Sequence, residues 1–207
     1  MTQVDELKSN QSKSNELFFE EQEKYYAESA GSNVLKLENF TKYVSRESIA
    51  RFLARNEIFK KQLDMAEKLE LPIIVHARGM IDQIIKNIRE KKIKGGIIHA
   101  FNGSFQQAEQ LIKLGFKLGF GGVITYERAK HVRSLAQNLP IEAIVLETDA
   151  PDMNPSWLEN ILPNVPAQLK KISQIFCKLR GLDTQVIADT LRRNTIEALP
   201  KLGRLYT

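Results

Sequence analysis

The chain has little of several features that define whole classes of protein. It contains one cysteine in 207 residues, so no internal disulfide can form and disulfide-rich secreted scaffolds are excluded. We expect this residue, Cys177, to be a buried thiol in a reducing, cytoplasmic setting. No apolar run approaches the roughly 20 residues of a transmembrane helix, and the polar, acidic N-terminus has no apolar signal-peptide core. We therefore expect no membrane partner.

Charge and composition divide the chain into two zones. Residues 1–33 are rich in Ser, Asn, Gln and Glu and carry a net charge of −4, whereas residues 34–207 carry +9. We expect 1–33 to be a polar leader, partly disordered or with a short helix, and 34–207 to be one folded domain. A basic surplus of this size favours an anionic partner such as nucleic acid, although many basic proteins bind none.

From residue 34 onward, short apolar runs rich in Val and Ile alternate with amphipathic stretches. The runs predict five strands, at 34–38, 72–77, 96–101, 116–125 and 143–149. The amphipathic stretches predict helices at 46–69, 80–90, 105–114, 128–137, 166–179 and 184–199. Ser104 and Gln107 have the spacing of a helix capping box. Apolar strands that alternate with helices predict an α/β fold with a parallel sheet covered by helices.

Polar side chains stand at the ends of three of these strands. His76 ends the run Ile-Ile-Val-His, His99 ends Ile-Ile-His, and Asp149 ends Ile-Val-Leu-Glu-Thr-Asp. In parallel barrels the carboxyl ends of the strands face one mouth, and two imidazoles and a carboxylate meeting there bind a divalent metal well. The alternative for a single histidine is a hydrogen-bonded core residue. His131 lies in a basic stretch and is expected at the surface.

Four motifs carry a resemblance to a known family. They are His76-Ala-Arg78, His99-Ala-Phe-Asn-Gly-Ser104, Gly119-Phe-Gly-Gly-Val-Ile-Thr-Tyr126 and Leu146-Glu-Thr-Asp-Ala-Pro-Asp-Met153. Three later pieces agree with them, namely Asn164-Val-Pro166, Leu179-Arg-Gly181 and Asn194-Thr195. Over roughly residues 46–200 the chain resembles the TatD family of metal-dependent deoxyribonucleases. The resemblance implies a TIM-type (β/α) barrel, DNA as substrate, and one or two divalent ions (Mg, Mn or Zn) at the strand ends.

The resemblance also implies a set of metal ligands. His76 and His99 match metal-binding histidines, and Asp149 matches an aspartate that binds metal and takes the proton of the attacking water. The family opens with a strand ending in His-x-His, which this sequence lacks. The family's glutamate in a Gly-Glu-x-Gly-Leu-Asp motif has Glu38 as its nearest counterpart, without the glycines. A salt-bridging surface glutamate is an equal interpretation of Glu38.

Further residues are expected to face or support the substrate. Arg78 is either a salt-bridge residue or a clamp for phosphate oxygens, because a guanidinium can hold two oxygens at once. Backbone amides near Asn102 and Ser104 would hold the remaining oxygens. Ser104 and Glu147 match supporting or substrate-facing positions of the family.

Length predicts an incomplete barrel. Residues 34–207 number 174, below the roughly 200 of a complete (β/α)₈ barrel, and about five strands are predicted where eight are needed. Open sheet edges would be covered by the leader or by a second copy of the chain. The expected activity is metal-dependent phosphodiester hydrolysis, as in a TatD-like deoxyribonuclease. The alternatives are a degenerate, weakly active or inactive nucleic-acid-binding member, a truncated gene product, and a hydrolase of small esters or amides.

Overall fold

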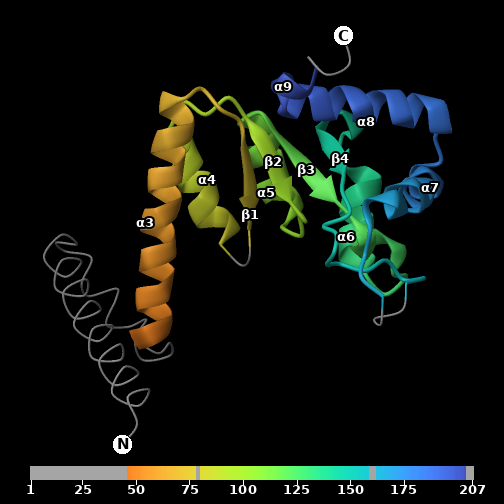
Figure 1. Cartoon of the computed structure of the whole chain (residues 1–207), viewed down its shortest axis with the longest axis horizontal. Helices are drawn as coiled ribbons and strands as arrows, with labels where there is room; N and C mark the ends of the chain where they lie inside the picture. The colour runs from red at the N-terminus through yellow and green to blue at the C-terminus, as the bar shows by residue number, and fades with distance from the viewer. Residues whose placement is uncertain (1–45, 78–79, 159–161, 204–207) are drawn as a thin grey trace, which may run out of the picture. The chain divides into compact units, whose positions relative to one another are not determined.

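The computed structural model of the chain describes residues 46–77, 80–158 and 162–203 (Figure 1). The predicted leader and the predicted strand at 34–38 lie outside these ranges. The chain divides into two compact units, residues 1–61 and 62–207, and helix α3 (Arg46–Lys68) crosses the boundary between them. The sheet, and the candidate site at its end, belong to the second unit.

A parallel sheet forms the centre of the second unit. Its strands are β1 (Ile73–His76), β2 (Gly96–His99), β3 (Phe116–Phe120) and β4 (Ile144–Leu146). They lie side by side in chain order, each parallel to the next. The helices that connect them are α4 (Ile81–Arg89), α5 (Phe105–Lys113) and α6 (Lys130–Asn138). Parallel strands in chain order, each followed by a helix, form an arc of a β/α barrel, so the predicted α/β class is confirmed.

The remaining described elements follow or interrupt this repeat. They are the 3-10 helices η2 (Gly122–Thr125), η3 (Ile141–Ala143) and η4 (Pro166–Gln168), and the helices α7 (Leu169–Arg180), α8 (Thr184–Ala198) and α9 (Pro200–Gly203). None of the described helices is long and apolar enough to cross a membrane.

Two predicted strands are too long. The sequence predicts a strand over 143–149 that ends in Asp149, but β4 ends at Leu146, and Asp149 lies in the loop beyond it. The sequence predicts a strand over 116–125, but the strand ends at Phe120 and η2 follows it. The turn is closed by Thr125, whose hydroxyl donates to the carbonyl of Gly122 at 2.6 Å. A Cβ at Gly122 would lie 2.4 Å from the carbonyl oxygen of Met153, so this turn packs backbone against backbone. Such a contact between distant segments leaves no hydrophobic pattern in the sequence.

The two faces of the sheet are covered unequally. On one face, Val75, Ile98, Leu118 and Ile144 are register partners across the four strands, and all of them are buried. The apolar sides of the connecting helices complete this core, with buried residues that include Ile84, Ile85, Ile88, Ala108, Leu111 and Leu135. This alternation follows the period-two pattern of a strand.

The opposite face, which we call the inner face, is covered only in part. Ile97 and Val145 form a buried cluster there with Ala198 at the end of α8. Ile74 is the register partner of Ile97 on β1, yet it is 63% exposed. Among the described strands β1 pairs with β2 alone, so it forms one edge of the sheet. The end of α8 therefore closes the inner face over β2 and β4 but not over Ile74.

Two side-chain interactions attach helix α8 to the sheet. Asn194 of α8 is buried, and its amide donates to the carbonyls of Ile141 and Ile144, both at 2.7 Å. Lys117 of β3 donates to Glu197 at 2.7 Å. The Asn-Thr piece noted in the sequence therefore includes a residue that fixes α8 against the start of β4.

Candidate metal centre

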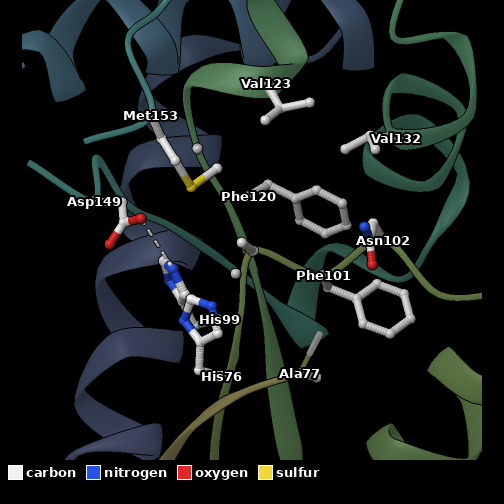
Figure 2. A pocket seen from close by; sticks show the side chains of 13 residues that line it. His76, Ala77, His99, Phe101, Asn102, Phe120, Val123, Val132, Asp149 and Met153 are labelled. Carbon is white, nitrogen blue, oxygen red and sulfur yellow. Dashed lines mark ion pairs between the residues drawn. The ribbon is translucent and has the colours of Figure 1, made fainter. Parts of the chain in front are cut away.

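Three of the predicted site residues meet at the carboxyl ends of the strands. His76 and His99 are the last residues of β1 and β2 and are register partners, with ring centroids 5.1 Å apart. Asp149 lies in the loop after β4, and its Oδ2 is 3.3 Å from Nε2 of His99. Figure 2 shows the two imidazoles side by side, with the Asp149 carboxylate turned toward His99. Neighbouring parallel strands bring these residues together although they are far apart in sequence.

His99 is held by a second carboxylate. Nδ1 of His99 lies 2.9 Å from Oε2 of Glu147, and Oε1 of Glu147 accepts a hydrogen bond from the backbone N–H of Ala100 at 2.7 Å. A carboxylate at Nδ1 assigns the ring proton to that nitrogen, which leaves the lone pair of Nε2 available. Nε2 is buried and makes no hydrogen bond, since its contact with Asp149 lacks hydrogen-bond geometry. Glu147 is therefore a supporting residue of His99.

Gly119 of β3 makes room for this carboxylate. A Cβ at position 119 would lie 2.5 Å from Oε2 of Glu147. Gly119 is the register partner of Val145, and Glu147 stands two residues later on the same face of the sheet. Any side chain at 119 would displace Glu147 from His99, so the glycine is part of the site.

The loop that carries Asp149 is built from hydrogen bonds. Asp149 itself has φ = 56°, in the left-handed region that Asp tolerates better than most residues. Its carbonyl accepts from the N–H of Asp152 at 2.8 Å. The buried amide of Asn164 donates to the carbonyls of Thr148 at 2.7 Å and Asp152 at 2.8 Å, on either side of Asp149. The sequence assigned Asn164 no role; its Asn-Val-Pro piece was the only signal.

The imidazoles and Asp149 lie at one end of a pocket of about 240 Å³. Its other walls are mostly apolar and include Phe101, Asn102, Phe120, Val123, Val132 and Met153 (Figure 2). A concave, mainly apolar pocket with a few convergent polar groups is typical of a ligand-binding site. Asn102, predicted to lie near the substrate, lines this pocket, and its role toward a substrate stays a prediction.

The remaining predicted site residues, two for the substrate and one for the metal, divide into two groups. Ser104 is the N-cap of α5: its hydroxyl oxygen accepts from the N–H of Gln107 at 3.1 Å, and the Gln107 side chain accepts from the N–H of Ser104 at 2.9 Å. The predicted capping box is thus confirmed, and Ser104 does not line the pocket. Arg78 and Glu38 lie outside the described residues, so their predicted roles stay predictions.

The donor chemistry around His99 fits a divalent cation. A histidine whose Nδ1 is held by a carboxylate and whose Nε2 is buried without a hydrogen bond has the arrangement of a metal-ligating histidine. Asp149 adds an oxygen donor next to it. Within residues 46–77, 80–158 and 162–203, no three His, Cys, Asp or Glu side chains are placed to hold an ion together. The described residues thus supply part of a coordination shell, beginning with His99 and Asp149.

Comparison with known proteins decides the family. A model of the family described as TatD related DNase matches residues 43–200. The chain belongs to the TatD family. It is 36% identical over 146 residues to the "uncharacterized metal-dependent hydrolase YjjV" of Escherichia coli K12, which covers 70% of this chain and 56% of that one. An "uncharacterized metal-dependent hydrolase" of Haemophilus influenzae is 39% identical over 130 residues, covering 62% and 49%. The chain thus spans about half the length of the curated relatives it matches.

Solved structures agree with this family. The crystal structure of YjjV, described as a TatD homologue from Escherichia coli, superposes with a TM-score of 0.70 at 35% identity, covering 73% of this chain and 58% of that one. An uncharacterized amidohydrolase from Saccharomyces cerevisiae superposes with a TM-score of 0.60 at 16% identity, covering 70% and 59%. The second likeness shows the fold alone. The arc of parallel strands is therefore the TatD fold over the part that this chain covers.

Proposed function

We propose that this TatD-family chain is a metal-dependent phosphodiesterase that cleaves DNA. The observation that carries the proposal is the buried Nε2 of His99, held in position by Glu147 and adjacent to Asp149 at the end of a pocket. This arrangement supports hydrolysis assisted by a metal. The basic surplus of residues 34–207 supports a polyanionic substrate.

Each residue of the site has a distinct task in this reaction. His99 through Nε2 and Asp149 through Oδ2 would hold the cation, with His76 as the next nearest nitrogen donor. When bound, a divalent cation lowers the pKa of water and polarises a phosphoryl oxygen. Glu147 keeps the proton of His99 on Nδ1, so that Nε2 points its lone pair into the site. Asp149, whose carboxylate lies beside Nε2 of His99 and remains partly accessible to water, would accept the proton of the attacking water.

Metal content and cleavage test the proposal together. The purified chain is loaded with Mg²⁺, Mn²⁺ or Zn²⁺, and cleavage of a labelled oligonucleotide is followed with and without chelator. We expect metal-stimulated cleavage that His99→Ala removes together with bound metal. Lys113→Ala, at an exposed position of α5, serves as the control and should change neither. Unchanged metal content and cleavage in His99→Ala would overturn the assignment.

A second candidate is a family member that binds nucleic acid without cleaving it. It is favoured by one observation: among the described residues, no three His, Cys, Asp or Glu side chains are placed to hold an ion together. The cleavage assay, together with a measurement of oligonucleotide binding with and without chelator, separates the two candidates. Oligonucleotide binding that is insensitive to chelator, with no cleavage under any of the three metals, would favour the binding protein.

A further inference from the structure

A second hollow is lined by residues that stand two or three positions along the chain from residues of the pocket. It has a volume of about 470 Å³ and is lined by Thr125, Tyr126, Glu127, Arg128 and Ser156. The same two chain segments wall both spaces. The segment that begins with η2 supplies Val123 to the pocket and Thr125 to the hollow, and the loop after β4 supplies Met153 to the pocket and Ser156 to the hollow. A ligand that followed these segments out of the pocket would reach the hollow.

Hydrogen bonds join the two segments at the hollow. The N–H of Ser156 donates to the Thr125 hydroxyl oxygen at 2.8 Å. The hydroxyl of Tyr126 donates to the carbonyl of Asn154 at 2.9 Å, which fixes the plane of its ring. The walls of the hollow are thus set by the fold before any ligand arrives, which lowers the entropic cost of binding.

Arg128 stands over the ring of Tyr126. Its guanidinium carbon lies 5.2 Å from the ring centroid, a cation–π contact that orients the group. Within the described ranges Arg128 makes no hydrogen bond or ion pair beyond this contact, and it is exposed. Its N–H groups are therefore available to a ligand. Arg133 of α6 differs, because its guanidinium donates to the carbonyl of Ile124 at 2.6 Å and so belongs to the fold.

The surroundings of Arg128 favour an anion. Glu127 is the acidic residue of the lining, and it is outnumbered by Arg128 together with the exposed Lys130. Helix α6 begins at Lys130 with Ala129 as its N-cap, which offers no side-chain cap. The positive end of the α6 dipole therefore lies at the same loop.

We propose that this hollow binds a second phosphate of the nucleic-acid strand whose scissile phosphate occupies the pocket. Arg128 holds the phosphate through two N–H groups, a geometry that guanidinium matches well, and Tyr126 keeps the guanidinium in place. The inference rests on the proposed function and sharpens it. A polynucleotide fills both spaces, whereas a small phosphodiester reaches only the pocket.

Binding without cleavage is the first test. A fluorescently labelled single-stranded oligonucleotide is titrated with the full chain in chelator, and anisotropy is read at several salt concentrations. We expect Arg128→Gln to weaken binding several-fold and to lower the slope of log affinity against log salt by about 0.7, the value for one phosphate contact on a single strand. Arg128→Lys should fall between Arg128→Gln and the unaltered chain, because it keeps the charge but loses the paired N–H groups.

The matched control is Lys113→Gln. This exposed lysine lies in the last turn of α5, which returns toward the start of β3 and so lies at the other end of the sheet from His99. It removes the same charge and should leave affinity and salt slope unchanged. Equal unfolding midpoints for all variants exclude a folding defect. No oligonucleotide binding by the unaltered chain, or an unchanged affinity and slope in Arg128→Gln, overturns the proposal.

Cleavage of two substrates is the second test. Arg128→Gln should raise KM for an oligonucleotide and leave the turnover of bis(p-nitrophenyl) phosphate unchanged, since the small diester does not reach the hollow. Equal losses on both substrates would overturn the proposal, because Arg128 would then act on the pocket itself. If the unaltered chain cleaves neither substrate, the proposed function fails, while the anisotropy measurement still decides whether the hollow binds phosphate.

Discussion

Strands β1 and β2 are near copies in sequence that lie in different surroundings. Ile73-Ile-Val-His76 and Gly96-Ile-Ile-His99 pair residue by residue in a parallel register. Ile74 is 63% exposed, whereas its partner Ile97 is 7% exposed. The cause is the number of neighbours: β2 lies between two strands and under the end of α8, and β1 pairs with β2 alone among the described strands. Similar strand sequences therefore predict that the two isoleucines occupy equivalent positions in the sheet, but not that they are equally buried.

The two histidines at the ends of these strands also differ in how many neighbours surround them. His99 is contacted by Glu147 and Asp149 from the loop after β4, and its side chain is 12% exposed. His76 is exposed, and its described contact at the site is the ring of His99. A strand end thus places a histidine at the mouth of the sheet, while the carboxylates that follow β4 decide which nitrogen of that histidine can bind a metal.

The largest expected effect concerns these two histidines. We expect His99→Ala to lower bound metal and oligonucleotide cleavage by more than about 100-fold, because even supporting residues of a metal site are worth about 10–100-fold. His76→Ala should cost less, since no described carboxylate orients its ring. The measurements are metal per chain and initial cleavage rate. Equal losses in the two variants would show that His76 contributes as much to metal binding as His99.

The next effect concerns the isoleucines of the inner face. Ile97→Ala removes a buried side chain from the cluster with Val145 and Ala198, and should lower the free energy of unfolding by about 2–4 kcal/mol. Ile74→Ala should change it by less than about 0.5 kcal/mol, because the side chain is largely exposed. Urea unfolding followed by circular dichroism measures both. A large loss in Ile74→Ala would show that another part of the chain, or a second copy, covers β1.

A smaller effect sharpens the comparison at His99. Glu147→Gln keeps the size of the side chain but removes the negative charge next to Nδ1, so we expect metal affinity to fall by about 10–100-fold. Competition with a chromogenic chelator measures the affinity. Glu109→Gln, an exposed acid of α5, is the control and should leave it unchanged. Unaltered affinity in Glu147→Gln would mean that the carboxylate does not orient His99.

The smallest effect concerns the closure of the inner face by α8. The hydrogen bond from Lys117, together with its charge, lowers the pKa of Glu197 below its ordinary value of 4.5. A carboxyl whose pKa is lowered in the folded state contributes stability above its unfolded pKa, and that contribution disappears as pH falls through the folded pKa. Since the Glu197 side chain is 53% exposed, the contribution is about a few tenths of a kcal/mol.

Unfolding at several pH values tests this sign. Glu197→Gln should be slightly less stable than the unaltered chain at pH 7, and the difference should disappear as pH falls through the lowered pKa of Glu197 in the folded chain. Urea midpoints between pH 7 and pH 3 measure the difference. A difference that grows toward low pH would contradict the assignment of the ion pair.

The local sequence pattern was enough to predict those helices and strands that are stabilised by contacts between residues close in sequence. The helix over 105–113 was predicted from its spacing and from Ser104 and Gln107, because a capping box is made by residues three apart. The four described strands were predicted from their apolar runs, because each is buried on at least part of its length. The strand over 116–125 was predicted too long, because the backbone of Met153, far along the chain, packs against Gly122.

Short-range periodicity and residue type were enough to predict the order of strands and helices, the TatD motifs, and the positions of His76 and His99 at the ends of their strands. Only the tertiary structure decided which histidine is held by a carboxylate. Glu147 reaches His99 across β3 because Gly119 has no side chain. Asn164, 15 residues after Asp149, holds the loop of Asp149 by donating a hydrogen bond to the carbonyl of Thr148. Contacts of this kind join residues many positions apart, so no local pattern in the sequence records them.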